Sequence, residues 1–496
     1  MFKRILCLLI ALMLPCVALA EYTMAGYDPE NSYRDWNTNL FFQRMEEKTG
    51  IAFTYQQYKT LDKWSEAKKA MKNGDANLPD IFFKAELNHA ETIDLLDRGV
   101  IVDLKPYLEK YCPNLCAVLN ASPEYWDAIT LPDGRIGALP YISEQPLQNA
   151  VWLNSAWMEY LKLSMPTTAE ELTQVLRQFR ERDPNQNGRA DEIPLAFIGP
   201  FDLKFLGHAY GLVANDYNIF VESDEVRFMP LEAEFRPFVE WLRALYAEGL
   251  IDPKGFETSD SLRAISDADD ANIYGGAITT MMSNFLPASW IVQYDLMMPL
   301  TFNGEQIYRS FYGNVLSGAF AVTTGCENIE EILGWIDLFY TQEVSILGTV
   351  GQENVDYVVD GDGTWRLTTA TQNNASFSSD VTIYSGGTTP GISSEAFHAR
   401  YTELAVRHVS EQADSINAIA ERAFPYYALT YAQEAQIAPL QSKIGRYVDT
   451  QIALWVLGEQ EISDATFANF ENTLAEYGLA DFMAFWQNIY NTQCRE

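Results

Sequence analysis

The feature that most constrains this chain is the ten-residue stretch from position 183 to position 192, which is dense in oxygen-bearing side chains. Gly188 lies in its middle, where a curled loop needs a residue that tolerates a positive φ. Calcium binds about six to eight oxygens from carboxylates, amides and backbone carbonyls, and a curled loop supplies them at alternate positions. The stretch therefore predicts a structural Ca²⁺ site. The predicted ligands are Asp183, Asn185, Asn187, Arg189 through its backbone oxygen, Asp191 and Glu192.

The match of this stretch to the EF-hand loop is incomplete. Its twelfth position is Pro194 instead of Glu, so Asp191 and Glu192 would have to complete the ligand shell early. The alternative is a polar turn between a helix and a strand, because Asp, Asn, Gly and Pro all favour turns. Oxygen donors are dense here even for a turn, and this density favours the metal.

The length and the first residues of the chain predict an exported protein with two lobes. A chain of 496 residues is too long for one ordinary hydrophobic core. Residues 1–20 have the features of a signal peptide, because Lys3 and Arg4 precede an apolar run and small residues at Ala18 and Ala20 suit cleavage. No later uninterrupted apolar run reaches about 18 residues, the length of a membrane-spanning helix. We expect the mature protein in the periplasm or outside the cell.

The cysteines indicate neither a lipid anchor nor zinc. Cys16 lies in the signal peptide, but Leu14 and Pro15 before it do not match the small residues of a lipid-attachment motif. No histidine lies at zinc-ligand spacing from a cysteine. Export makes disulfides possible, and four cysteines permit three pairings among which the sequence does not choose. The mature cysteines are Cys112, Cys116, Cys326 and Cys494.

The charge of the chain excludes two kinds of partner. The formal net charge is −34, and loss of Lys3 and Arg4 makes it two units more negative. Such a charge repels nucleic acid and anionic membrane surfaces. A strongly anionic ligand would need a locally basic site, for which Arg34, Lys84 and Arg309 are candidates against the alternative of solvated charges.

Strands and helices are predicted to alternate from the start of the mature chain. This alternation indicates an α/β fold with mainly parallel sheets and crossover helices. In such sheets ligands bind beyond the carboxyl ends of the strands, so the loop 27–37 and the end of the strand at 81–83 are candidate ligand surfaces. The predicted elements are strands at 21–26, 51–55 and 81–83 and helices at 39–48 and 63–72, the second helix capped by Asp62.

The second half of the chain repeats this pattern. Ser155 is the expected cap of a short helix, and Thr168 with Glu171 forms a capping box for a helix that ends at the candidate calcium loop. The apolar face expected for this second helix is Leu172, Val175, Leu176 and Phe179. A strand is expected at 193–197. The strand 150–153 is interpreted as the entry to the second lobe and the apolar strand 312–322 as the return. The predicted lobes are 21–148 plus 306–345, and 149–305 plus 346–496 with a helical tail.

Several short motifs follow one another along the chain: Asn73-Gly-Asp75, Leu78-Pro-Asp80, 133–140, 153–158, 183–194, Asp252-Pro253 and 351–354. In this order they resemble the extracellular solute-binding proteins of ABC importers, in the branch of calcium-holding oligosaccharide binders that includes alginate-binding proteins. The resemblance implies a two-lobed clamshell of the periplasmic-binding-protein type II, flanked by helices and closing on its ligand by a hinge. It also implies a monomer, a carbohydrate ligand and an ABC permease as the membrane partner.

A sugar site combines flat apolar faces with hydrogen-bonding groups at fixed places. The alternative for each aromatic candidate is core packing, because 11 Trp, 27 Tyr and 27 Phe cannot all lie in one site. Trp365 is a weaker candidate. The predicted ligand-binding residues, chosen at strand ends and lobe junctions, are Trp36, Asn37, Lys84, Tyr141, Trp290 and Tyr312.

Two other classes remain open. A secreted glycoside-active enzyme is one, because 68 acidic residues place two carboxylates about 5–10 Å apart in almost any cleft. A peptide-binding or surface-recognition protein on the same fold is the other. The chain has no Gly-x-Ser-x-Gly, His-Glu-x-x-His or phosphate-loop motif, so we expect a binding protein without catalytic residues.

Overall fold

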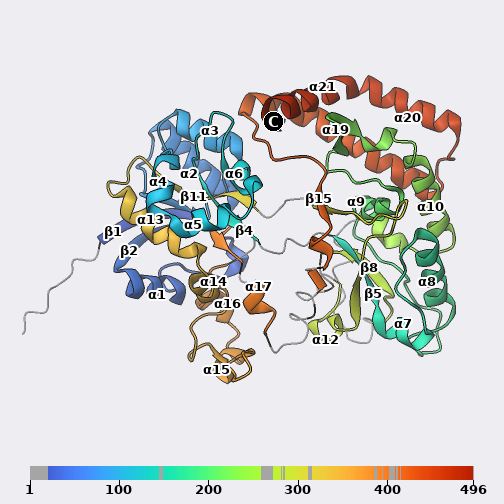
Figure 1. Cartoon of the computed structure of the whole chain (residues 1–496), viewed down its shortest axis with the longest axis horizontal. Helices are drawn as coiled ribbons and strands as arrows, with labels where there is room; N and C mark the ends of the chain where they lie inside the picture. The colour runs from blue at the N-terminus through green and yellow to red at the C-terminus, as the bar shows by residue number, and fades with distance from the viewer. Residues whose placement is uncertain are drawn as a thin grey trace, which may run out of the picture.

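The computed structural model describes residues 20–143, 149–257, 272–280, 282, 285–310, 315–384, 388–393, 395–401, 408, 412–413 and 415–494. They form two lobes side by side (Figure 1). The expected signal peptide, apart from Ala20, and the candidate ligand residue Tyr312 lie outside the described residues. Within the described residues, no helix is both long and apolar enough to cross a bilayer.

Lobe one is built on a six-stranded sheet of order β14-β4-β11-β3-β1-β2. β1 pairs in parallel with β2 and β3, and β14 pairs in parallel with β4. β11 enters between β3 and β4 and is antiparallel to both, because it returns from the other lobe. The three predicted strands are confirmed. The bounds are β1 Ala20–Tyr27, β2 Ile51–Tyr58, β3 Ile81–Phe83, β4 Leu139–Ile142, β11 Val315–Val322 and β14 Gly391–Ile392.

Several helices of lobe one begin at side-chain caps, as in α1 and α2. α1 (Leu40–Thr49) is capped by Asn39, which accepts from the backbone N–H of Phe41. α2 (Leu61–Asn73) is capped by Thr60, so the prediction of Asp62 as the cap is wrong. Thr60 has the extended backbone that a cap requires, whereas Asp62 already lies in the first turn. The other helices of this lobe include α3 His89–Asp97, α4 Lys105–Tyr111, α5 Pro113–Leu119, α6 Pro123–Ile129, α13 Ile329–Asp337 and α14 Gln342–Thr349.

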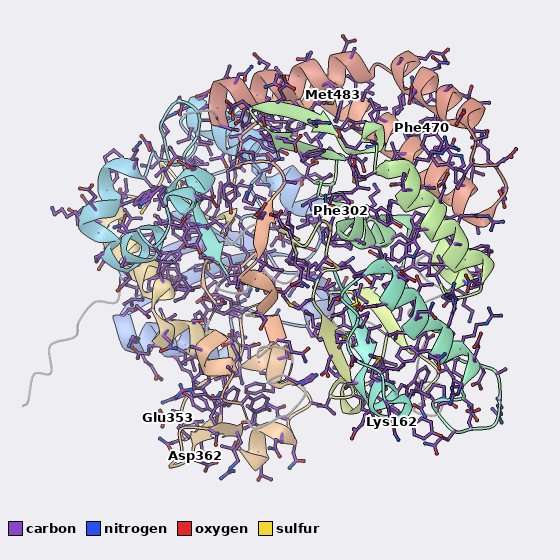
Figure 2. The ribbon with its side chains drawn as sticks, turned by 45° about the vertical axis from the view of Figure 1, so that its right-hand side comes forward. Lys162, Phe302, Glu353, Asp362, Phe470 and Met483 are labelled. Atoms are coloured by element: carbon purple, nitrogen blue, oxygen red, sulfur yellow. The ribbon has the colours of Figure 1, made fainter. Side chains whose placement is uncertain are left out.

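Residues after 345, which the sequence assigned to the second lobe, continue along lobe one as far as β14. β12 (Tyr357–Val359) and β13 (Trp365–Leu367) form a hairpin with a small core of its own. Figure 2 shows this unit at one end of lobe one, where Glu353 and Asp362 are labelled. Its core rings are Tyr357, Trp365, Phe397 and Tyr401.

Lobe two holds a three-stranded sheet of order β8-β5-β9, with bounds Gly276–Thr279, Ala150–Asn154 and Tyr294–Met297. Its three strands pair antiparallel to one another and its parallel contacts are isolated bridges, so the expectation of mainly parallel sheets does not extend to this sheet. Residues 193–197 make two isolated bridges, Ile193 to Tyr274 and Ala196 to Ala277, instead of the predicted strand.

The helices of lobe two include α7 Ser155–Leu161, α8 Ala169–Glu181, α10 Phe235–Ala247, α19 Tyr431–Leu457, α20 Asp464–Glu476 and α21 Leu479–Ile489. Among these, α7 contacts β5 and β9 of the sheet. α7 is capped by Asn154 and not by the predicted Ser155. In α8, Thr168 accepts from the backbone of Glu171, but the Glu171 carboxylate accepts from Thr167 instead of completing the box. The helical tail, marked by Phe470 and Met483 in Figure 2, lies over α10.

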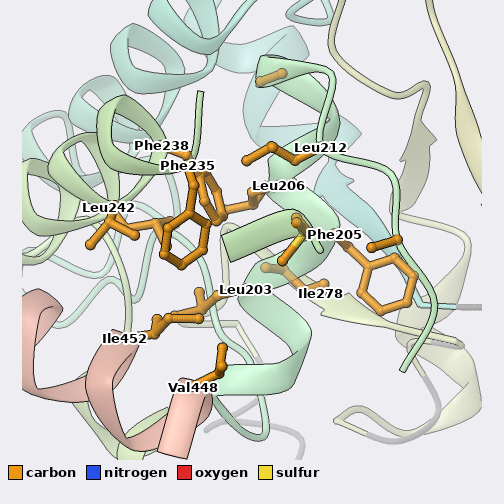
Figure 3. Close-up of a cluster of buried hydrophobic side chains, with 14 of the residues drawn as sticks. Leu203, Phe205, Leu206, Leu212, Phe235, Phe238, Leu242, Ile278, Val448 and Ile452 are labelled. Atoms are coloured by element: carbon orange, nitrogen blue, oxygen red, sulfur yellow. The ribbon is translucent and has the colours of Figure 1, made fainter. Parts of the chain in front are cut away.

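The core of lobe two lies between these helices (Figure 3). Phe235, Phe238 and Leu242 of α10 face Val448 and Ile452 of α19, and all five are buried. Burial of each such side chain stabilises the fold by about 1.5–3 kcal/mol. The apolar face predicted for the helix before the calcium loop is confirmed, since Leu172, Val175, Leu176 and Phe179 are all buried.

Candidate functional site

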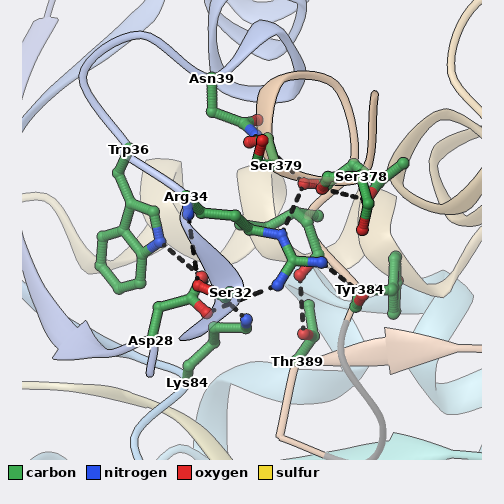
Figure 4. A network of polar contacts seen from close by, with 12 residues as sticks. Asp28, Ser32, Arg34, Trp36, Asn39, Lys84, Ser378, Ser379, Tyr384 and Thr389 are labelled. Atoms are coloured by element: carbon green, nitrogen blue, oxygen red, sulfur yellow. Dashed lines mark hydrogen bonds and ion pairs between the residues drawn. The ribbon is translucent and has the colours of Figure 1, made fainter. Parts of the chain in front are cut away.

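A buried charge network lies at the carboxyl ends of β1 and β3 (Figure 4). Lys84 Nζ lies 3.1 Å from Asp28 Oδ2, and the indole N–H of Trp36 donates to the same oxygen at 3.1 Å. A guanidinium nitrogen of Arg34 lies 3.5 Å from Asp28 Oδ1. Lys84 is 0% exposed and Trp36 is 1% exposed. Burial lowers the pKa of Lys84 to about 8, although the Asp28 carboxylate acts in the opposite direction.

This network also holds the segment 379–384 against the loop 27–37 and the start of α1. Arg34 donates from Nε to the backbone oxygen of Thr382 at 3.0 Å and from its terminal nitrogen to that of Tyr384 at 3.2 Å. Asn39 donates to the backbone oxygens of Ser379 and Thr382. The candidate residues Lys84 and Trp36 are thus brought together through Asp28, at the sheet edge where ligands were expected.

The other sequence candidates are spread over both lobes. Asn37 is exposed and its amide donates to Asp35 at 2.8 Å. Tyr141 is half-buried, with its ring 6.1 Å from that of Tyr384. Trp290 lies in α12 (Ala288–Ile291) of lobe two and is half-buried. Trp365 is buried in the hairpin unit, where its ring stacks on Tyr401 at 4.1 Å.

Sequence reasoning missed a pocket beside this network. It has a volume of about 210 Å³ and is lined by Glu86, Asn88, Ser317 and Thr388 together with apolar atoms. The only local signal was the position of Glu86 two residues beyond Lys84, past the end of a predicted strand. Glu86 and Ser317 line the same pocket, although β11, which carries Ser317, comes from a distant part of the chain. A carboxylate, an amide and hydroxyls on one wall suit a ligand rich in hydroxyl groups.

The candidate calcium loop is curled by three left-handed residues, Asp183 (φ 44°), Gln186 (φ 58°) and Gly188 (φ 73°). The Asp183 carboxylate accepts from the backbone N–H groups of Asn187 at 3.1 Å and Gly188 at 3.0 Å. The Asn187 amide donates to both carboxylate oxygens of Asp191. Hydrogen bonds within the loop therefore already bring its oxygen-bearing side chains close together.

Glu192 is the least satisfied member of this loop. Its buried Oε1 has no hydrogen-bond partner among the residues that the structure describes. Burial raises the pKa of Glu192, and the Asp183 and Asp191 carboxylates act in the same direction. Within the described residues, no three His, Cys, Asp or Glu side chains gather as a metal cluster. Carboxylate, amide and backbone oxygens nevertheless match the donor chemistry of calcium, and a cation would relieve the orphaned carboxylate oxygen.

The mature cysteines carry free thiols. Cys112 is buried and its thiol donates to the backbone oxygen of Leu333 at 3.6 Å. Burial raises the pKa of this thiol, with Asp337 contributing. Cys116, Cys326 and Cys494 are free as well.

No protein-family model matches the chain. Among curated proteins, the fructooligosaccharide ABC transporter substrate-binding protein FusA of Streptococcus pneumoniae is 26% identical over 486 residues, covering 93% of this chain and 88% of the relative. The polygalacturonan/rhamnogalacturonan-binding protein YtcQ of Bacillus subtilis is 26% identical over 121 residues, 24% of this chain and 23% of that protein.

Solved structures share the whole fold. FusA in complex with kestose has a TM-score of 0.70 at 24% identity, covering 95% of this chain and 99% of that one. An HMO-binding, ABC-transporter-associated solute-binding protein from Bifidobacterium longum infantis has a TM-score of 0.76 at 18% identity, covering 97% and 100%. An EF-hand mutant of FusA also matches, with a TM-score of 0.71. The chain is therefore similar over most of its length to FusA, an ABC transporter substrate-binding protein, and it shares the fold of such proteins.

Proposed function

We propose that this chain captures a carbohydrate, in particular an oligosaccharide, between its two lobes and delivers it to an ABC permease without altering it. The observation that carries this proposal is the similarity to FusA over 93% of the chain. The two lobes with separate cores support capture by closure, since hinged lobes close around ligands in proteins of this architecture. The protein would act as an exported monomer.

We propose that the six predicted contact residues belong to this site, some by touching the sugar and others by supporting the loop 27–37. Asn37, Tyr141 and Trp290 keep exposed surface, which supports direct contact with a sugar. Trp36 and Lys84 are buried, so they would hold the loop 27–37 in place instead of touching ligand. Tyr312 remains a proposed contact.

We also propose that the loop 183–192 holds a structural Ca²⁺ through the six ligands predicted above. The buried Oε1 of Glu192, unpartnered among the described residues, and the raised pKa of its carboxyl support cation binding at this loop. The ion would supply positive charge that neutralises three neighbouring carboxylates, and it would have no part in ligand chemistry.

Binding of purified protein to a glycan panel tests the main proposal. The panel contains neutral and uronate oligosaccharides, screened by thermal shift and measured by calorimetry, because a ligand that binds only the folded state raises its stability. We expect one sugar to bind with a stoichiometry of one and to be recovered intact after long incubation. Products in the recovered sugar would favour the glycoside-active enzyme, and binding of peptides alone would favour the peptide-binding class.

A further inference from the structure

The pocket lined by Glu86, Asn88, Ser317 and Thr388 lies at the edge of lobe one from which the chain leaves for lobe two. β4 ends at Ile142 and the chain continues to β5 in the other lobe. β11, which carries Ser317, follows β10 (Tyr308–Ser310), and β10 pairs with β15 (Ala420–Arg422). The pocket is therefore a feature of the boundary between the lobes.

The Glu86 carboxylate is the chemically unusual group in this pocket. It is half-buried and accepts no hydrogen bond within the described part of the chain. The nearest cations are engaged elsewhere, since Lys68 Nζ lies 2.9 Å from Glu91 Oε1 and Lys84 Nζ lies 3.1 Å from Asp28. Burial raises the pKa of Glu86, while Lys68 and Lys84 act against this. A half-buried carboxylate without protein donors can accept hydrogen bonds from a ligand that enters the pocket.

The backbone around Glu86 is fixed before any ligand arrives. The indole N–H of Trp64 donates to the Ala85 oxygen at 2.7 Å, and Lys68 Nζ donates to the backbone oxygen of Glu86 at 3.2 Å. Glu86 itself has φ 51°, a costly conformation that the surrounding contacts must maintain.

A glycine on the neighbouring strand makes this turn possible. Gly318 has φ 84°, and an added Cβ there would approach the Leu87 backbone oxygen to 1.8 Å. The backbone N–H of Leu87 donates to the Gly318 oxygen at 3.1 Å. The turn and the strand are thus locked together, which is the preorganisation that a binding site requires.

The other polar groups complete a mixed wall of donors and acceptors. The Asn88 side-chain oxygen accepts from the backbone of Glu91 at 2.8 Å, and its amide nitrogen has no partner among the described residues. The Ser317 hydroxyl lies 3.2 Å from His89 Nε2. We propose that this pocket is a subsite for an uncharged sugar unit, whose hydroxyls donate to the Glu86 carboxylate, and that Glu86 selects against uronic acids.

The selection follows from charge. A uronate carboxylate in this pocket would face the Glu86 carboxylate, and within the described part of the chain the nearby ammonium groups of Lys68 and Lys84 already have carboxylate or backbone partners. Repulsion of the wrong ligand is a common source of specificity. This inference rests on the proposed carbohydrate function and names the class of sugar that the site takes.

Calorimetry at pH 7 on four proteins tests it: the wild type, Glu86→Gln, Glu86→Ala and the control Glu109→Gln. Glu109 is an exposed carboxylate on α4 of the same lobe, outside the pocket. The probes are kestose, maltotriose and lacto-N-tetraose as neutral sugars, and trigalacturonate and an alginate trisaccharide as uronates. Glu86→Gln keeps the side-chain volume, so it carries the test if Glu86→Ala does not fold.

We expect the wild type to bind a neutral probe and to bind the uronates at least about tenfold more weakly. Glu86→Ala and Glu86→Gln lose about ten- to a hundredfold in affinity for the neutral sugar, the loss expected for a hydrogen bond to a charged group, and Glu109→Gln is unchanged. Wild-type affinity in both Glu86 variants, or a wild type that prefers uronates, overturns the subsite and leaves the carbohydrate function standing. A wild type that binds no carbohydrate overturns both.

Discussion

At the scale of residues, burial decides what each ionisable side chain can do. Lys84 was a ligand candidate because it follows a strand, yet its ammonium is fully enclosed and paired with Asp28. Glu86, two residues later, keeps an open carboxylate. Two charged residues at nearly the same position therefore have opposite roles, one structural and one available to ligand.

His208 provides a residue-scale prediction. It is 7% exposed between the rings of Phe205 and Tyr308, and its Nε2 has no hydrogen-bond partner. Burial lowers its pKa to about 3, with Arg309 contributing. In the unfolded chain the His208 imidazole binds a proton near pH 6.5, whereas in the folded chain it stays neutral until a much lower pH. The free energy of unfolding therefore falls as the pH drops from about 6.5 towards 3.

We expect the wild type to lose about 2 kcal/mol more unfolding free energy between pH 7 and pH 5 than His208→Leu, which removes the titrating ring. Urea denaturation of both proteins at the two pH values measures the difference. Equal losses in the two proteins would show that other groups carry the acid sensitivity of this lobe.

At the scale of elements, the ends of helices and strands carry the sites. The end of α8 leads into the candidate calcium loop, and the end of β3 leads into the Glu86 turn. Both loops hold residues with positive φ other than glycine, Asp183 and Gln186 in one and Lys84 and Glu86 in the other. Such conformations cost free energy and persist where the surrounding contacts enforce them.

Metal removal tests the calcium loop. We expect CaCl2 to raise the melting temperature, with a stabilisation of about 2.7 kcal/mol at a free concentration one hundred times the Kd, and EDTA to remove it. Asp191→Ala abolishes the shift and Glu192→Gln reduces it, since each removes ligand charge. Glu181→Gln, an exposed carboxylate at the end of α8, serves as the control and keeps the full shift. A wild-type melting temperature indifferent to EDTA would remove the metal from the proposal.

At the scale of the whole molecule, two separate cores are joined by chain crossings and by one long helix. α19 lies along α10 in lobe two, while its beginning also contacts α3 in lobe one. There Lys72 Nζ lies 5.7 Å from the ring of Tyr431. Such a contact at one end of a helix is small beside either core, so the lobes keep the freedom to move relative to each other.

We therefore expect ligand to compact the molecule. The sugar with the largest thermal shift in the glycan panel should lower the radius of gyration in small-angle X-ray scattering, because closure buries it between the lobes. A non-binding sugar of the same size is the control. A sugar that stabilises the protein without changing the radius of gyration would argue against hinge closure.

The local sequence pattern was sufficient to predict many of the strands and helices of this protein. Apolar spacing and end signals identified β1 to β3, α1 and the buried face of α8, because period and capping depend on neighbours in the chain. The pattern was off by one or two residues at two caps, where Thr60 and Asn154 stand in place of the predicted Asp62 and Ser155. It failed where contacts between distant segments decide, since Gly391 and Ile392 joined the sheet of lobe one and Trp36 was buried under rings from three elements. The openness of Glu86 likewise depends on β11, more than 200 residues away in the sequence, so only folded contacts could reveal it.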